Sequence, residues 1–193
     1  MKYVSIDIET TGLDPEKHDL IEFGAVVDDL MHPEIPVEEL PTFHCYNVKD
    51  DYVGSPFALS MHPEIFRRIA MKPEGFRYCY NGKMGKMFYD FLKDHKLYTD
   101  EHGKIYINCA GKNFASFDLQ FLKRQTDIES SKIKLRHRSI DPGSMLLRPT
   151  DDTIPGTEEC LTRCKLEPVV AHTAVEDAIA VIRMIRSIFF GQR

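Results

Sequence analysis

The sequence has no tryptophan, few cysteines and no long apolar run. Its five cysteines are odd in number and widely spaced, which argues against a disulfide framework and predicts a protein of the reducing cytoplasm. A membrane span needs about 18 consecutive apolar residues. The longest apolar stretch, residues 179–190, is interrupted by Arg183 and Arg186, so we expect no membrane partner. The first residues enter a strand-like pattern at once, which leaves no room for a signal peptide.

Positive charge is also in short supply. Lysine and arginine together number 25 against 30 aspartates and glutamates, which gives a formal net charge of −5. Proteins that bind nucleic acids usually carry an excess of positive charge, so the sum alone argues against such a partner. Bound divalent cations can reverse that argument, because they are often the largest local charges in a site. The net charge therefore does not exclude a nucleic-acid substrate.

The rest of the composition is ordinary for a globular protein. Hydrophobic residues make up 42% of the chain and charged residues 28%, which excludes a disordered or low-complexity scaffold. The sequence shows no internal repeat, no linker and no change of composition along its 193 residues. A chain of this length most often forms one domain. We therefore expect a single domain that spans residues 1–193.

Two hydrophobic periodicities alternate along the chain. In residues 3–9 apolar and polar side chains alternate, which is typical of a strand. The last helix starts at a capping box formed by Thr173 and Glu176, and an apolar stripe follows. We expect strands at residues 3–9, 20–28, 41–48, 104–110 and 133–140, and helices at residues 56–70 (broken at Pro63), 84–95, 116–124, 157–164 and from 173 onward. This order predicts an α/β fold of three layers, with a mixed five-stranded sheet flanked by helices.

Two carboxylates lie on one face of the first predicted strand. Asp7 and Glu9 are two residues apart, so their side chains project from the same face, about 7 Å apart along the strand. Like charges on one face of a strand repel each other, and strands disfavour carboxylates. A solvated strand face is one explanation. A hard divalent cation that offsets the repulsion is the other, and the flanking apolar residues Val4, Ile6 and Ile8 favour it because they indicate a central strand.

Three further polar residues complete the constellation. Asp118 follows a loop after a buried-looking strand, His172 precedes the last helix and Asp177 lies in its first turn. Each alone has an ordinary explanation, such as a helix cap or a partner of the helix dipole. Together, four carboxylates suit two Mg²⁺ ions about 3.5–4 Å apart, the arrangement that cleaves phosphodiesters. A histidine beside the attacking water could accept its proton.

Three short motifs resemble those of the DEDDh 3′→5′ exonucleases. They are Ser5–Asp14 (SIDIETTGLD), Asn113–Asp118 (NFASFD) and His172–Asp177 (HTAVED). The first is highly specific, and the third is specific because it begins a helix. That family has a ribonuclease H-like fold and includes oligoribonuclease, ribonuclease T and the proofreading subunits of polymerases. Asn113 lies five residues before Asp118, a spacing similar to that of oligoribonuclease.

The resemblance implies a role for each motif residue. It makes Asp7, Glu9, Asp118 and Asp177 the metal ligands and His172 the general base. The residues that would contact the terminal nucleotide are Thr10, Thr11, Gly12 and Leu13, with Leu13 wedged against its base. Asn113, Phe114 and Phe117 are further candidates for substrate contact, Phe114 by stacking on a base and Phe117 with a core position as its alternative.

The function implied is metal-dependent hydrolysis of phosphodiester bonds from the 3′ end of single-stranded DNA or RNA. The products would be nucleoside 5′-monophosphates, and the cofactor two Mg²⁺ ions, with Mn²⁺ able to substitute. The partner would be a single strand with a free 3′ end, and a homodimer or an association with a polymerase stays open. One alternative is a non-catalytic ribonuclease H-like module that binds nucleic acid or tethers to a polymerase. Another is a zinc-stabilised interaction protein that uses Cys160, Cys164 and His172.

Four cations alternate along the last predicted strand. Lys132, Lys134, Arg136 and Arg138 share one face of it, opposite two apolar residues. A solvated strand face is the ordinary explanation for such a pattern. A track for phosphate groups that leads toward the acidic site is the alternative, because each phosphate contact adds affinity for a nucleic acid.

Overall fold

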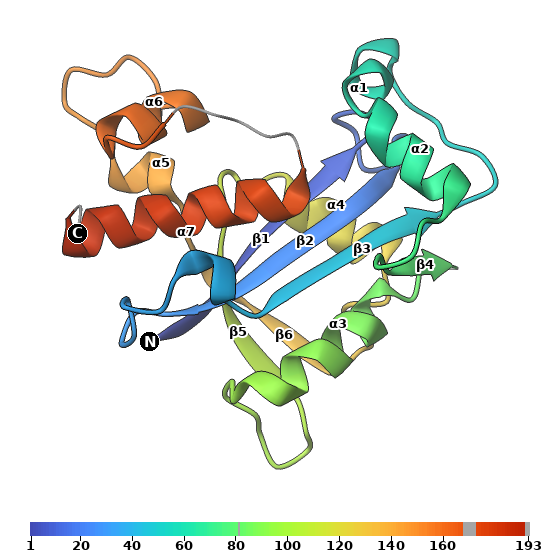
Figure 1. Cartoon of the computed structure of the whole chain (residues 1–193), viewed down its shortest axis with the longest axis horizontal. Coiled ribbons are helices and arrows are strands. Elements are labelled where there is room, and N and C mark those ends of the chain that lie inside the picture. The colour runs from blue at the N-terminus through green and yellow to red at the C-terminus, as the bar shows by residue number, and fades with distance from the viewer. Residues whose placement is uncertain (81, 168–172, 192–193) are drawn as a thin grey trace.

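A six-stranded mixed sheet forms the centre of the protein, with strand order β4-β3-β2-β1-β5-β6 (Figure 1). The coordinates are those of a computed structural model, and they describe residues 1–80, 82–167 and 173–191. The strands are β1 (Lys2–Thr10), β2 (Leu20–Asp29), β3 (Thr42–Val48), β4 (Tyr78–Tyr80), β5 (Ile105–Ala110) and β6 (Ile133–Ile140). The antiparallel β1, β2 and β3 form the predicted meander, and β5 and β6 run parallel to β1.

The sheet differs from the prediction by one strand. Instead of five strands it has six, because β4 adds to the free edge of β3 in a parallel direction. Its sequence is Tyr-Cys-Tyr, and three residues are too few to show a period of two. The other five strands lie where the alternation placed them, within two residues at each end.

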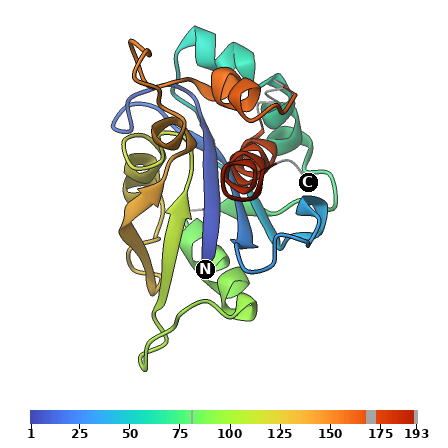
Figure 2. The ribbon, with the colours of Figure 1, turned by 90° about the vertical axis from the view of Figure 1, so that its left-hand side faces the viewer.

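Helices cover both faces of the sheet, which gives the three predicted layers (Figure 2). One face carries α7 (Ala174–Phe190), α6 (Thr157–Arg163) and the short α5 (Pro142–Met145), with α2 (Pro63–Met71) beside them. The other face carries α3 (Met84–Leu92) and α4 (Asp118–Gln125). The remaining helices are α1 (Pro56–Met61) and two short 3₁₀ helices, η1 (Val37–Glu39) and η2 (Lys93–His95). No described helix is long and apolar enough to span a membrane.

Helix boundaries follow local chemistry. The helix expected over residues 56–70 is two helices, because Pro63 has no N–H to continue α1 and instead begins α2. The helix expected to reach residue 95 ends at Leu92, and the chain tightens into η2. The four residues of α5 were not predicted, since one turn carries no periodicity. These differences leave the predicted layers unchanged.

Alternation along β1 decides which side chains reach the core. Val4, Ile6 and Ile8 pack on the α3 and α4 side, in a cluster that includes Phe23 and Phe88. The ring centroids of Phe23 and Phe88 lie 4.9 Å apart in an edge-to-face arrangement. Residues of the opposite parity therefore face α7, as the buried Tyr3 in the α7 cluster confirms. The side chains of Asp7 and Glu9 therefore project from β1 on the face of the sheet that α7 covers.

Candidate active site

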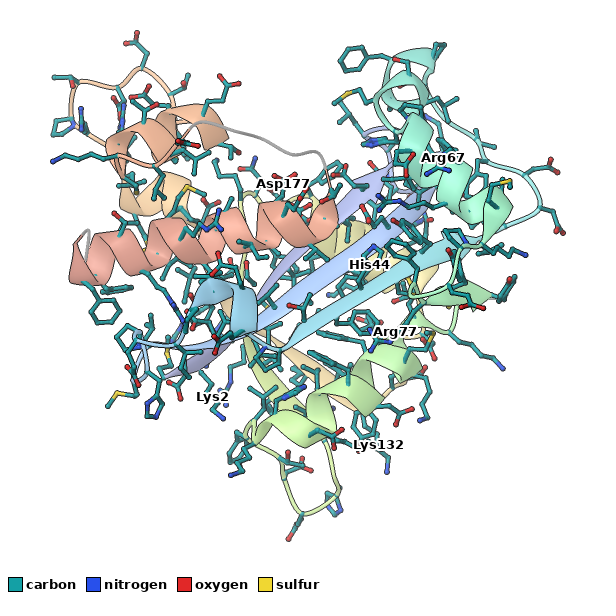
Figure 3. The ribbon with its side chains drawn as sticks, in the orientation of Figure 1. Lys2, His44, Arg67, Arg77, Lys132 and Asp177 are labelled. Carbon is teal, nitrogen blue, oxygen red and sulfur yellow. The ribbon has the colours of Figure 1, made fainter. Side chains whose placement is uncertain are left out.

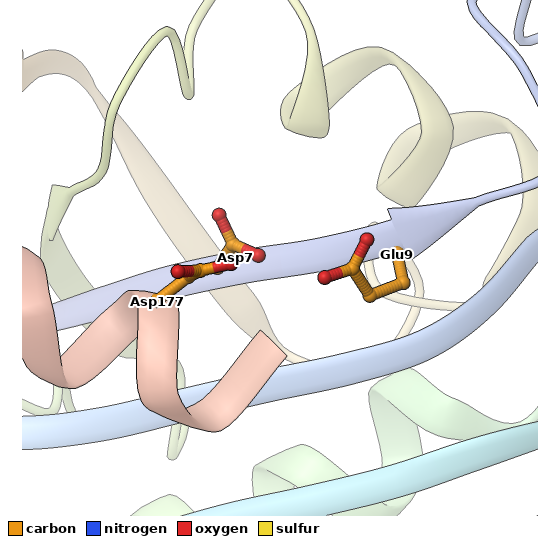
Figure 4. A group of neighbouring side chains, drawn as sticks. All are labelled: Asp7, Glu9 and Asp177. Carbon is orange, nitrogen blue, oxygen red and sulfur yellow. The ribbon is translucent and has the colours of Figure 1, made fainter. Parts of the chain in front are cut away.

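Three carboxylates meet where β1 ends and α7 begins (Figure 4). Asp7 and Glu9 extend from β1, and Asp177 comes from the first turn of α7. Each offers one oxygen atom, and the three atoms all lie within 4.8 Å of one another. The three side chains are half-buried, which leaves the group open to a small ligand. Among the described residues this is the only cluster of histidine, cysteine and acidic side chains with such spacing.

Gly24 allows α7 to begin this close to the sheet. It lies directly opposite Asp7 in the ladder between β1 and β2. A β-carbon at Gly24 would overlap the backbone of Ala174, the first residue of α7. Only glycine permits so close a backbone approach. The missing side chain therefore brings the first turn of the helix, and Asp177 with it, next to Asp7.

A buried acid on β2 fixes the same end of α7. Glu22 lies opposite Glu9 in the ladder and is 1% exposed. Its Oε2 accepts a hydrogen bond from the Ala174 N–H at 3.0 Å, and its Oε1 lies 2.5 Å from His44 Nε2. Figure 3 shows His44 and Asp177 on the same side of the sheet. Glu22 therefore ties β2, β3 and α7 together beside the carboxylate cluster.

The predicted capping box does not form. The helix starts at the predicted residue, but the Thr173 hydroxyl donates to Glu176 Oε2 at 2.7 Å and caps no backbone N–H. Glu22 accepts from the first helical N–H in its place. Sequence reasoning missed Glu22, although a carboxylate within the apolar run of residues 20–27 was a usable signal. A cap supplied from another strand cannot be recognised from helix-start motifs.

Glu22→Ala is expected to destabilise the protein by about 1–3 kcal/mol. The substitution leaves the buried Ala174 N–H and the His44 ring without their acceptor, and unsatisfied buried donors cost about that much. Urea unfolding measures the change. Glu16→Ala is the control, since the Glu16 carboxylate is 65% exposed and pairs with a surface arginine. Equal stability of the two variants would contradict a structural role for Glu22.

The electrostatics of the cluster favour a bound cation. Burial raises the pKa of Asp7 well above its usual range, and the neighbouring Asp118 and Glu9 raise it further. Burial and the nearby Asp177 also raise the pKa of Glu9, to about 8. Both shifts mean that the ionised forms are destabilised when no cation is present. Because all the donors are carboxylate oxygens, the ligands that Mg²⁺ and Mn²⁺ prefer, these residues fit a divalent metal site.

Asp118 adjoins the cluster without belonging to the close group of three. It is the first residue of α4, 3% exposed, and its Oδ1 accepts a hydrogen bond from the Ile8 N–H at 3.1 Å. The β1–β5 ladder ends at Ser5, so Ile8 has no partner on β5. Burial raises the pKa of Asp118 to about 7. Asp118 therefore holds the end of β1, from a position where its charge acts on both Asp7 and Glu9.

Two histidines bear on the site. His172, the expected general base, lies outside the described residues, so its role stays a prediction. His62 was not predicted. It precedes α2, is 6% exposed and places Nε2 at 3.5 Å from Glu9 Oε2. No sequence signal marked it, because its closeness to Glu9 arises only when α2 folds back over the sheet.

The loop after β1 brings an apolar side chain to the surface near the cluster. Thr10 and Thr11 are buried, and the Thr10 hydroxyl donates to the Gly12 carbonyl at 2.8 Å. A β-carbon at Gly12 would lie 2.5 Å from the His18 ring, so a glycine is required there. Leu13 is 83% exposed. This exposure leaves Leu13 available to a ligand, and its contact with the terminal base stays a prediction.

The second motif serves mainly the core. Phe114 is 2% exposed and belongs to the cluster beneath α3 and α4, so its ring has no open face for stacking on a base. Phe117 packs half-buried against the same cluster, with its centroid 5.2 Å from that of Phe121. Asn113 is exposed with φ of +60°, and its N–H donates to Asp141 at 3.0 Å. The structure thus leaves only Asn113 of these three fully exposed to solvent.

Comparison with known proteins identifies the family. A sequence profile of exonucleases, RNase_T, matches residues 4–185, which is most of the chain. This chain belongs to the RNase_T exonuclease family. The resemblance to exonucleases that the three motifs indicated is thereby confirmed. A comparison with curated protein sequences gives no match.

Solved structures share the fold of this RNase_T family member. E. coli Exonuclease I in complex with a dT13 oligonucleotide matches with a TM-score of 0.60 and 18% identity, over 99% of this chain and 41% of that one. S. pombe Pop2p in an Mg²⁺- and Mn²⁺-bound form matches with a TM-score of 0.59 and 15% identity, over 98% and 84%. The chain thus spans about two fifths of the length of Exonuclease I. The predicted ribonuclease H-like fold is confirmed.

Proposed function

We propose that this RNase_T family member is a metal-dependent 3′→5′ exonuclease. It acts on single-stranded DNA or RNA and releases nucleoside 5′-monophosphates. The observation that carries this proposal is the meeting of Asp7, Glu9 and Asp177 within 4.8 Å in a chain of the exonuclease family. Exonuclease I was solved with a single-stranded oligonucleotide, and Pop2p with Mg²⁺ and Mn²⁺, which supports both the substrate and the metals.

The protein side chains divide the work of the reaction. Asp7, Glu9, Asp118 and Asp177 would hold two Mg²⁺ ions, with Mn²⁺ able to substitute. When bound, such ions promote attack by water and stabilise the leaving 3′-oxygen. His172 accepts the proton of the attacking water as general base. Leu13 packs against the terminal base and, with the backbone of residues 10–12, sets which nucleotide is cut.

The alternatives are less well supported by the described residues. Cys160 and Cys164 lie in the apolar cluster under α7, and their Sγ atoms face the carbonyls of Pro155 and Met184. That setting is typical of structural thiols. A module that only binds nucleic acid would have no use for buried like charges that destabilise it in the absence of a metal. All five cysteines are buried and none forms a disulfide, which fits the cytoplasm that we propose as the compartment of the protein.

Labelled single strands test the proposal. Strands of DNA and RNA with a 5′ label, together with dinucleotides, are incubated with the protein and Mg²⁺ or Mn²⁺. We expect a ladder that shortens from the 3′ end, nucleoside 5′-monophosphates as products, and full loss of activity in EDTA that excess Mg²⁺ restores. Internal cleavage, or undiminished activity in EDTA, would overturn the proposal. Size-exclusion chromatography of the same sample tests for the homodimer.

A further inference from the structure

We propose that the exposed face of β5 and β6 binds single-stranded nucleic acid beyond the catalytic carboxylates. The face is defined by Tyr98, Tyr106, Lys134, Arg136 and Arg138. Its proposed occupant is the part of a substrate strand that lies 5′ to the terminal nucleotides. The assignment of that occupant as substrate rests on the proposed exonuclease function.

The cations of this face form no ion pair with any carboxylate in the described part of the chain. Lys134, Arg136 and Arg138 are exposed, and among the described residues no carboxylate lies within 4.0 Å of any of them. Other arginines of the chain are neutralised by neighbours, including Arg163 by Asp151 at 2.6 Å and Arg186 by Asp28 at 2.6 Å. In a protein with net charge −5, three adjacent unpaired cations form a local positive field. Phosphate groups are complementary to that field.

Two aromatic rings lie beside these cations. The ring centroids of Tyr98 and Tyr106 are 5.5 Å apart, and Tyr98 is 64% exposed. The guanidinium carbon of Arg136 lies 6.0 Å from the centroid of Tyr98 and 5.6 Å from that of Tyr106. Bases stack on exposed aromatic rings whatever their identity, and arginine adds to such contacts. The combination of rings and unpaired cations is the chemistry of a single-strand platform.

This platform lies on the same side of the sheet as the catalytic cluster. Ile105 and Ile107 point into the core beneath α3 and α4, so Tyr106, between them, points to the opposite side. That is the side of Ala110 and Tyr3, which both belong to the α7 cluster. Asp7 and Glu9 alternate along β1 in step with Tyr3, so their side chains lie on this side as well. A strand held at the carboxylates therefore meets the platform without crossing the sheet.

The edge position of β6 keeps the platform open. β6 is the last strand of the sheet, and α7 packs against β1 and β2 (Figure 2). The β5–β6 register shifts between Ile107 and Cys109, so the segment from Arg136 to Arg138 is left outside the regular ladder and is exposed. β6 lies two strands from β1, roughly 10 Å across the sheet. Lys132, before β6, lies well away from Asp177 in Figure 3.

Binding measured without cleavage tests the inference. The double variant Arg136→Ala/Arg138→Ala and the single variant Tyr98→Ala are compared with wild type by fluorescence anisotropy, using a labelled 20-nucleotide oligothymidylate in Ca²⁺ at several salt concentrations. Each phosphate contact on a single strand contributes about −0.7 to the log–log salt slope, so the double variant should flatten it by about 1–1.5. Tyr98→Ala should weaken binding by roughly 5- to 100-fold with an unchanged slope, because stacking carries no charge.

A charge-matched control separates this face from general charge. The control Lys93→Ala/Arg183→Ala removes two exposed, ion-paired cations, Lys93 just after α3 and Arg183 on α7. It should leave the salt slope and the affinity unchanged. Hydrolysis of a dinucleotide should be the same in all variants, because a dinucleotide has no further nucleotide to reach the platform. KM for the long strand should rise in the platform variants alone.

The outcomes distinguish the two proposals. If wild type cleaves the strand but the platform variants bind it with the same affinity and salt slope as the control variant, the inference is wrong. The cations then serve to keep the β6 edge from pairing with other chains. If wild type binds the strand with the stated dependence on Arg136, Arg138 and Tyr98 but cleaves nothing, the exonuclease proposal fails and the platform stands.

Discussion

Asp7→Asn is expected to abolish turnover and to weaken Mg²⁺ binding. Asp7 belongs to the carboxylate cluster, and the charges of Glu9, Asp118 and Asp177 all act on it, so we expect it to serve both ions of the proposed function. Neutralising it removes the charge that holds the ions at the separation required for in-line displacement. Single-turnover cleavage of a labelled strand measures the first effect, and isothermal titration with Mg²⁺ measures the second.

The same variant should fold at least as well as wild type when no metal is present. Burial and then the like charges of Asp118 and Glu9 raise the pKa of Asp7, and a neutral amide at that position avoids both the desolvation and the repulsion. Thermal unfolding in EDTA therefore separates loss of chemistry from loss of structure. Asp51→Asn is the control, because Asp51 is exposed and is not a member of the carboxylate cluster. Turnover by Asp7→Asn within tenfold of wild type would contradict the metal-site assignment.

His172→Ala is expected to slow turnover by roughly 10²–10⁴-fold while the metals remain bound. General-base catalysis contributes about that factor, and the lost proton acceptor cannot be replaced by a carboxylate that already holds a cation. The acidic limb of the pH–rate profile should change as well, because a protonated histidine cannot accept the proton of the attacking water. Mg²⁺ titration and a pH–rate series measure both.

His62 supplies the discriminating comparison. It contacts Glu9 from α2, so His62→Ala should alter metal affinity rather than the shape of the pH–rate profile. His102→Ala, on a side chain that is 83% exposed, should change neither. A normal pH–rate profile in His172→Ala together with an altered profile in His62→Ala would identify His62 as the general base.

The strand alternation and the motif at β1 were sufficient to predict most of the fold. Asp7 and Glu9 were expected on one face of a central strand, and the structure shows them there. Asp177 was expected at the start of the last helix, which is where it joins them. These features depend on local periodicity and on residues close to one another in sequence, which is why the sequence alone was enough.

Features made by contacts between distant segments could not be predicted. The cap of α7 comes from Glu22, 152 residues away, so a helix-start motif misidentified it. His62 reaches Glu9 only through the packing of α2. Phe114 was assigned to a base because it adjoins a motif, but the loop turns its ring into the core. In each case the deciding partner belongs to another element, and periodicity does not report on it.

The close approach at Gly24 also sets when the carboxylate cluster can form during synthesis of the chain. Asp7 and Asp177 are 170 residues apart in the sequence, and the two meet only when the first turn of α7 settles on the β2 backbone. At about 5–20 residues per second, a ribosome takes on the order of 10–30 s to make the chain between them. Throughout that interval the growing chain has no complete set of ligands. The metal site of the exonuclease proposed above therefore cannot form until the start of α7 has been synthesised.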